Sequence, residues 1–240
     1  MTGTLYVIGV GPGDPELLTL KAVRILREVQ YICVPKGREE GSSLALSIAE
    51  KAVDLRGKEV IEAYFPMRKT KNKGGAASGE LDEKWNETVE TVLCILGKGT
   101  DVAFITIGDP TIYSTFFYLY DRLLEHTPSL RVEIVPGISS VNASAARAGV
   151  SLGLADEKIA ILPATYTKDI KGILEQFDTV VLMKVHKVFG DVLQTLEGMG
   201  LAGNAVYVSR AGMEDERVVR NIRDIAHETL NYFSMVIIKK

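Results

Sequence analysis

The chain has 240 residues, of which 46% are hydrophobic and 25% charged, and its formal net charge is −3. This length and balance indicate soluble domains with a sizeable core, and the weak negative charge argues against a nucleic-acid partner. No hydrophobic run approaches the ~20 residues of a membrane-spanning helix, so no membrane partner is expected. Cys33 and Cys94 are isolated and the three histidines are scattered, which predicts a cytoplasmic protein without a bound metal.

The first half of the chain alternates continuous hydrophobic strands with amphipathic helices. This alternation predicts an α/β domain with a mostly parallel sheet that is covered on both faces, and we place it at residues 1–126. The basic and then small-residue segment Met67–Gly79 is expected to form a mobile loop. In chain order, the sequence predicts strands at 4–10, 31–35, 59–66 and 101–108, and helices at 16–29, 43–53, 81–99 and 111–126.

The second half has shorter helices and more closely spaced strands. It begins with a strand, a turn and a helix across residues 131–149, and Gly212–Ile225 has the pattern of a hairpin followed by a short helix. We therefore predict a second α/β domain, with a mixed sheet, at residues 127–240. Its further strands are expected near 159–164, 179–184, 204–212 and 233–240.

A glycine-rich turn follows the first expected strand, in the stretch LYVIGVGPGDPELLTL. A dinucleotide-binding fingerprint would need a third glycine at Asp14 and an acidic residue about 20 positions further on. The chain has neither, because its second strand ends in Cys-Val-Pro-Lys. Asp14 and Pro15 instead have the residue types of a helix N-cap and a first helical residue. A nicotinamide or flavin site is disfavoured, and a tight turn without any ligand remains an alternative.

Two further tight turns follow expected strands. IGDPTIY repeats Gly-Asp-Pro, with Asp109 as the expected cap, and VPGISS places Ser139 and Ser140 at the start of a helix. Ligands of parallel α/β sheets bind at the carboxyl ends of the strands. We therefore expect the three turns to line one crevice.

Together the stretches GVGPGDPELLTL, GDPTIYSTF and VPGISS, in this order and spacing, resemble the tetrapyrrole methylase family over essentially the whole chain. The family comprises S-adenosylmethionine-dependent enzymes of cobalamin and sirohaem synthesis, with diphthine synthase as a relative. PKGREEGSSLALSIAE, GDPTIYSTFFYLYDRL and IAILPA are most similar to members that methylate C-20 of precorrin-2 or cobalt-factor II. The resemblance implies two α/β domains with the active site in the cleft between them, and a homodimer.

The resemblance also assigns roles to particular residues. The first glycine turn would line the trough for the tetrapyrrole, and basic side chains would face the many carboxylates of this substrate. The expected substrate-binding residues are Gly11, Pro12, Gly13, Asp14, Lys36, Arg38, Arg68 and Lys69. S-adenosylmethionine, which becomes S-adenosylhomocysteine, would be held by Ile107, Gly108, Asp109, Ile112, Thr115, Ser139, Ser140, Met183, Ala211 and Met235.

Methyl transfer to C-20 must be followed by loss of a proton from that carbon. Asp109 and Tyr113 are the candidate catalytic residues, with Asp14 and solvent as further possibilities, and Asp109 suits this role only if its carboxylate is not occupied in capping. Tyr113 and Tyr118 are expected on one helix, at a spacing that lets at most one of them reach the substrate. The alternatives are a sibling methylase acting at another ring position, diphthine synthase, or a non-catalytic tetrapyrrole carrier.

Overall fold

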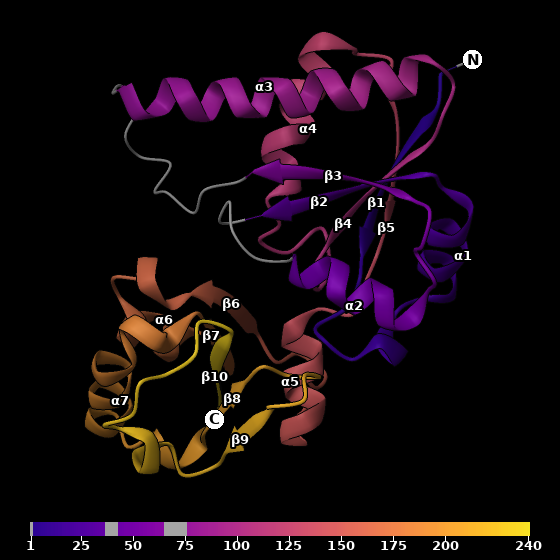
Figure 1. The fold of residues 1–240 in the computed structure, drawn as a ribbon. Coiled ribbons are helices and arrows are strands. Elements are labelled where there is room, and N and C mark those ends of the chain that lie inside the picture. The colour runs from indigo at the N-terminus through magenta and orange to yellow at the C-terminus, as the bar shows by residue number, and fades with distance from the viewer. Residues whose placement is uncertain (1, 37–42, 65–75) are drawn as a thin grey trace. The chain divides into compact units, whose positions relative to one another are not determined.

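The computed structural model describes residues 2–36, 43–64 and 76–240. The chain divides into two compact units, Met1–Ser139 and Ser140–Lys240, which are drawn in Figure 1 and described separately below. Most of the expected basic loop falls within 65–75, outside the described residues, and a helix already begins at Ala76.

The first unit contains a five-stranded sheet in which all neighbouring strands are parallel, in the order β3-β2-β4-β1-β5 (Figure 1). Each strand is short and rich in hydrophobic residues, as the sequence predicts for a sheet buried on both faces. The strands are β1 (Thr4–Gly9), β2 (Tyr31–Lys36), β3 (Glu59–Tyr64), β4 (Val102–Thr106) and β5 (Arg131–Val135). The predicted parallel first sheet is confirmed.

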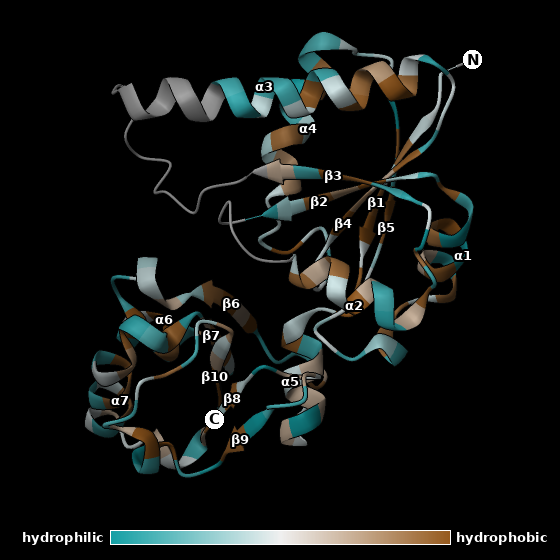
Figure 2. Cartoon of the chain, in the orientation of Figure 1, coloured by the Kyte–Doolittle hydropathy of each residue, from teal (hydrophilic) through white to brown (hydrophobic). Residues whose placement is uncertain are grey.

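Helices cover both faces of this sheet. Alternate residues of each strand point to opposite sides, so each face of the sheet presents hydrophobic side chains to its own pair of helices. Ile8 and Ile105 pack in a core with α1 (Leu20–Glu28) and α2 (Leu44–Ala52). Val7 and Phe104 pack in a second core with α3 (Ala76–Gly97) and α4 (Phe116–His126). Figure 2 shows hydrophilic and hydrophobic patches along α3, as expected for an amphipathic helix with one buried face.

The second unit contains a mixed five-stranded sheet in the order β6-β7-β10-β8-β9, in which only β6 and β7 are parallel neighbours. One face is covered by α5 (Ser140–Ala148) and the other by α6 (Ile170–Gln176) and α7 (Phe189–Gly198). The predicted mixed second sheet is confirmed. Its strands are β6 (Ile159–Pro163), β7 (Thr179–Met183), β8 (Ala205–Ser209), β9 (Arg217–Val219) and β10 (Ser234–Lys239).

The units divide between Ser139 and Ser140, whereas the sequence placed the boundary at 126/127. The reason is that β5 pairs with β1 along its whole length, from Thr4 opposite Arg131 to Ile8 opposite Val135. The segment 127–139 therefore completes the first sheet and does not begin the second.

Two helices begin later than the sequence predicts. The helix expected from Glu16 is a short 3-10 turn, Pro15–Leu17, followed by α1 from Leu20, because Thr19 accepts a hydrogen bond from the N–H of Ala22 and caps α1. The helix expected from Thr111 begins at Phe116. No helix among the described residues is long and hydrophobic enough to cross a membrane.

Candidate functional site

The connections that leave β1 and β4, two neighbouring strands of the first sheet, run over opposite faces of the sheet. The connection from β1 to β2 runs through α1 on one face of the sheet. The connection from β4 to β5 runs through α4 on the opposite face. Adjacent strands whose connections diverge in this way leave open the space beyond their carboxyl ends. Open α/β sheets bind their ligands at such a point.

Glycines bring the turns after β1, β4 and β5 into direct backbone contact. The N–H of Gly108 donates to the carbonyl of Gly11 at 2.7 Å, and the N–H of Gly11 donates to the carbonyl of Gly108 at 3.3 Å. A Cβ atom on Gly9 would lie 2.5 Å from the carbonyl oxygen of Gly108, and one on Gly137 would lie 2.4 Å from the same oxygen. Side chains at Gly9 and Gly137 are therefore excluded, and the three turns lie side by side as the strand ends predict.

Asp109 fastens two of these turns to each other. Its Oδ2 accepts a hydrogen bond from the N–H of Gly137 at 3.0 Å, and its Oδ1 accepts from the N–H of Thr111 at 2.8 Å and from the Thr111 hydroxyl. Both carboxylate oxygens are thus engaged by donors. Asp109 is not the helix cap that the sequence predicts, because α4 begins only at Phe116, but its carboxylate is occupied in holding the turn and is not free to abstract a proton.

Tyr113 lies in the turn before α4 and not on that helix, which corrects the prediction that it shares a helix with Tyr118. Its backbone is left-handed, with φ +53°, and its side chain is half-exposed. A left-handed conformation is uncommon for a residue with a bulky side chain and is a reason to suspect function. Partial burial raises the pKa of the Tyr113 phenol. Tyr118 lies on α4 and stacks on Trp85, with ring centroids 6.1 Å apart.

Two hydroxyls that the sequence did not single out also shape this turn. Ser114 accepts a hydrogen bond from the N–H of Phe116 at 3.2 Å, and its hydroxyl donates to that of the buried Thr106 at 3.4 Å. This pair fixes the chain between β4 and α4. The only advance signal was the hydroxyl content of TIYST, which by itself indicates little.

The other expected cofactor residues of the first unit lie within or next to these turns. Ile107 and Ile112 are partly buried on either side of the Gly108–Asp109 turn, and Ile107 packs against the core under α1 and α2. Thr115 directly precedes α4, and Ser139 is buried at the end of the turn after β5. Ser140 is the first residue of α5 and belongs to the second unit.

In the second unit, the structure brings Met183, Ala211 and Met235 into one hydrophobic cluster. Met183 lies opposite Met235 in the pairing of β7 with β10. Two left-handed residues follow the strands here, Lys184 after β7 with φ +58° and Arg210 after β8 with φ +52°. Their N–H groups donate to the carbonyls of Ser234 and Phe233, at 2.7 and 2.8 Å. Both strand ends are thereby fixed to the chain at the start of β10.

Two of the expected substrate-binding residues, Asp14 and Lys36, have their side chains bonded to other groups of the protein. Asp14 accepts from the N–H of Glu16 at 2.9 Å and so caps the 3-10 turn before α1. The ammonium of Lys36 lies 2.9 Å from the carboxylate of Glu62, and the Lys36 side chain is only 10% exposed. The charge of Lys36 is therefore compensated within the protein. Gly11, Pro12 and Gly13 lie in the turn after β1, and Arg38, Arg68 and Lys69 fall outside the described residues.

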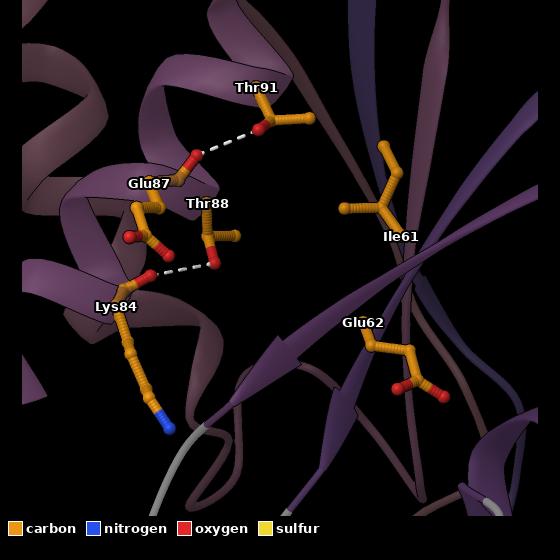
Figure 3. Close-up of a pocket in the computed structure, with 6 residues that line it drawn as sticks. All are labelled: Ile61, Glu62, Lys84, Glu87, Thr88 and Thr91. Atoms are coloured by element: carbon orange, nitrogen blue, oxygen red, sulfur yellow. Dashed lines mark hydrogen bonds between the residues drawn. The ribbon is translucent and has the colours of Figure 1, made fainter. Parts of the chain in front are cut away.

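The cavity drawn in Figure 3 does not belong to these turns. It has a volume of about 260 Å³ and lies between β3 and α3, lined by Ile61, Glu62, Lys84, Glu87, Thr88 and Thr91. As Figure 3 shows, the hydroxyls of Thr88 and Thr91 donate to the carbonyls of Lys84 and Glu87 on their own helix. Their hydrogens are thus engaged, and only their acceptor lone pairs remain for a ligand. Among the described residues, no group of three or more His, Cys, Asp and Glu could hold a metal ion.

The chemistry of the Gly108 turn indicates which ligands would fit it. Between Phe104 and Phe116 the chain offers backbone amides, hydroxyls and aliphatic side chains, one engaged carboxylate, and no lysine or arginine. Such a set suits a ligand built of hydroxyl, amine and hydrophobic groups and is poor for a pyrophosphate, which is bound through helix N-termini and basic side chains.

The chain is similar over nearly its whole length to known proteins of one family. The model of the tetrapyrrole (corrin/porphyrin) methylases matches residues 4–226. A probable cobalt-precorrin-2 C(20)-methyltransferase of Methanocaldococcus jannaschii is 40% identical over 98% of this chain and 96% of its own. The cobalt-precorrin-2 C(20)-methyltransferase of Salmonella typhimurium is 35% identical over 100% of this chain and 98% of its own.

A solved structure supports the fold. Uroporphyrin-III C-methyl transferase from Thermus thermophilus, complexed with S-adenyl homocysteine, aligns with a TM-score of 0.68. The alignment covers 99% of this chain and 98% of the other, at 21% identity. At this identity the likeness establishes a shared fold.

Proposed function

The chain belongs to the tetrapyrrole (corrin/porphyrin) methylase family, and from this premise we propose that it transfers a methyl group from S-adenosylmethionine to C-20 of cobalt-precorrin-2 in cobalamin biosynthesis. The observation that carries the ring position is the identity of 40% and 35%, over nearly the whole chain, to two relatives of that name. Both names specify the cobalt-containing substrate, which favours it over metal-free precorrin-2.

The cofactor is S-adenosylmethionine, the methyl donor of the family, and its product form is present in the Thermus thermophilus structure of the same fold. When bound, it supplies a methyl group on a positively charged sulfur. We assign it to the Gly108–Asp109 turn with Ile107, Ile112, Thr115 and Ser139, and to Ser140, Met183, Ala211 and Met235 in the second unit. Each assignment can be tested separately by measuring the affinity for S-adenosylhomocysteine.

The protein contributes mainly by positioning the reacting groups. Holding two reactants in line can lower a barrier by up to ~7–11 kcal/mol in favourable systems. Rigid turns serve this purpose, and Asp109 and the glycine contacts make the Gly108 turn rigid by joining it to the turns after β1 and β5. The turn after β1, Gly11–Asp14, is assigned to the tetrapyrrole.

In this proposal neither Asp109 nor Tyr113 takes up the C-20 proton. The carboxylate of Asp109 is engaged by Gly137 and Thr111, and the raised pKa of Tyr113 keeps its phenol protonated. Tyr113 can hold its proton at Oη and donate a hydrogen bond to the substrate. The C-20 proton is lost to water.

Incubation with S-adenosylmethionine labelled in the methyl group tests the proposal. We expect label to enter cobalt-precorrin-2 with a mass gain of one methyl group, and metal-free precorrin-2 to react more slowly. Binding of the tetrapyrrole without transfer of label would indicate the carrier alternative. Transfer to a translation-factor substrate instead would indicate diphthine synthase.

We also propose that the protein is a cytoplasmic homodimer without a nucleic-acid partner. The exposed Phe117 and Tyr118 on α4 are hydrophobic surface that a second copy could cover. Both cysteines are free thiols, which suits a reducing compartment. Sedimentation equilibrium should give twice the chain mass of 26.2 kDa, and a mass of one chain would contradict the dimer.

A further inference from the structure

The turn that follows β8 is held in shape by two carboxylates. Arg210 and Gly212 both have left-handed backbone, with φ +52° and +78°, and Ala211 between them is buried in the core under α5. Asp215 forms an ion pair with the guanidinium of Arg210. Glu216 reaches back along the chain and accepts a hydrogen bond from the N–H of Gly212 at 2.6 Å.

Glu216 also joins this turn to a neighbouring helix. The same oxygen, Oε2, lies 3.1 Å from Nε of Arg147 on α5. The Glu216 side chain is only 23% exposed, so its ion pair is partly shielded from solvent. A carboxylate shared between a backbone N–H and a guanidinium is held by charge-assisted hydrogen bonds, which are stronger than those between neutral groups.

We propose that Glu216 is a positioning residue for S-adenosylmethionine, acting through the backbone of Ala211 and Gly212. The inference rests on the proposed function, in which Ala211 contacts the cofactor together with Met183 and Met235. Left-handed backbone is unfavourable for a residue with a Cβ, and Arg210 adopts it within this turn. When the Glu216 carboxylate is removed, the turn relaxes and Ala211 no longer holds its place against the cofactor.

Arg147 supports Glu216 from the side. Arg147 and the N–H of Gly212 both donate to the same oxygen of Glu216. An acceptor oxygen at this place is therefore what the turn requires, more than a negative charge. Gln in place of Glu216 keeps an acceptor oxygen at the same distance from the backbone. Asp keeps the charge but is one methylene shorter, and its carboxylate does not reach Gly212.

The experiment measures the affinity for S-adenosylhomocysteine by isothermal titration calorimetry in the full chain and in Glu216→Ala, Glu216→Asp and Glu216→Gln. Melting temperatures are recorded in parallel. Glu197→Ala is the matched control, since it removes an ion pair of similar geometry, to Arg223 at 2.8 Å, that does not involve the turn. Steady-state kinetics then separate the KM for S-adenosylmethionine from kcat.

We expect Glu216→Ala and Glu216→Asp to weaken binding by about 10- to 100-fold, as for the loss of a hydrogen bond to a charged group, and Glu216→Gln by less than about 3-fold. The KM should rise while kcat at saturating cofactor changes little, and Glu197→Ala should bind like the parent. Equal affinity of Glu216→Asp and the parent, or a fall in kcat and melting temperature with KM unchanged, would overturn the inference. If Glu216→Ala does not fold, the comparison of Asp with Gln decides. A parent chain that binds no S-adenosylhomocysteine would instead refute the proposed function.

Discussion

At the scale of single residues, three glycines explain why the turns of the first unit meet. The spaces beside Gly9 and Gly137 are filled by the carbonyl oxygen of Gly108, so only hydrogen atoms fit there. At Gly9 and Gly137 the group that approaches closely is therefore the protein's own backbone.

Gly137→Ala should destabilise the protein, because the new methyl group must displace backbone atoms. We expect a loss of about 1–3 kcal/mol in the free energy of unfolding, as for other overpacked sites. Gly190→Ala on α7 is the control, since nothing lies within 4 Å of a Cβ at that position. It should be neutral or stabilising by up to ~1 kcal/mol. Urea denaturation measures both variants, and equal stability of Gly137→Ala and the parent would refute the close contact.

Asp109→Asn separates the role of this residue in holding the turns together from a role as base. The amide can accept through one oxygen only, so one of the bonds to Gly137 and Thr111 is lost and the turn is less firmly held. We expect weaker binding of S-adenosylhomocysteine, by about 10-fold for the loss of a charged hydrogen bond. Turnover at saturating cofactor should be largely retained. Abolished turnover in a variant that binds the cofactor normally would identify Asp109 as the base.

Tyr113 provides a prediction about pH. Its folded-state pKa is raised by burial, so the stability that its neutral form contributes is present below the unfolded pKa of about 10 and is lost only as the pH rises through the folded value. A plot of kcat against pH should therefore show no change caused by ionisation of Tyr113 between pH 6 and about pH 9. Tyr113→Phe should lower kcat without changing the shape of this profile. A change of kcat with pH that disappears in Tyr113→Phe would indicate that the phenol ionises during turnover.

At the scale of elements, hydrophobic runs predicted the strands well because both faces of each sheet are buried. The start of α4 was predicted poorly. Pro110 is a favourable first helical residue. Tyr113, however, has left-handed backbone that cannot be part of a right-handed helix, and α4 begins only at Phe116. The contacts that hold this turn come from residues far along the chain, such as Gly137 bonding to Asp109, and they leave no local pattern in the sequence.

The thiols of β2 and α3 test the burial of the first sheet. Cys33 is completely buried, which raises its pKa to about 12, while Cys94 is exposed on α3. A thiol-specific reagent at pH 8 should label Cys94 only, and both cysteines after denaturation. Because the folded pKa of Cys33 is raised, its contribution to stability falls as the pH rises above the unfolded value of about 8.5. Labelling of Cys33 in the native protein would contradict its place inside the sheet.

At the scale of the whole molecule, the sequence predicted two α/β units and the family, but not where the units divide. The pairing of β5 with β1 joins residues more than a hundred positions apart, and no local signal marks it. The motifs identified the turns after β1, β4 and β5, whereas the fixed carboxylates of Asp109 and Glu216 and the ion pair of Lys36 emerged only from the fold.

The proposed activity is the transfer of one methyl group to C-20 of the tetrapyrrole. The most direct test is a turnover with S-adenosylmethionine carrying a ¹³C-labelled methyl group, followed by NMR of the isolated product. We expect a single labelled methyl group attached to C-20 and a stoichiometric release of S-adenosylhomocysteine. A labelled methyl group at any other ring position would contradict the proposal.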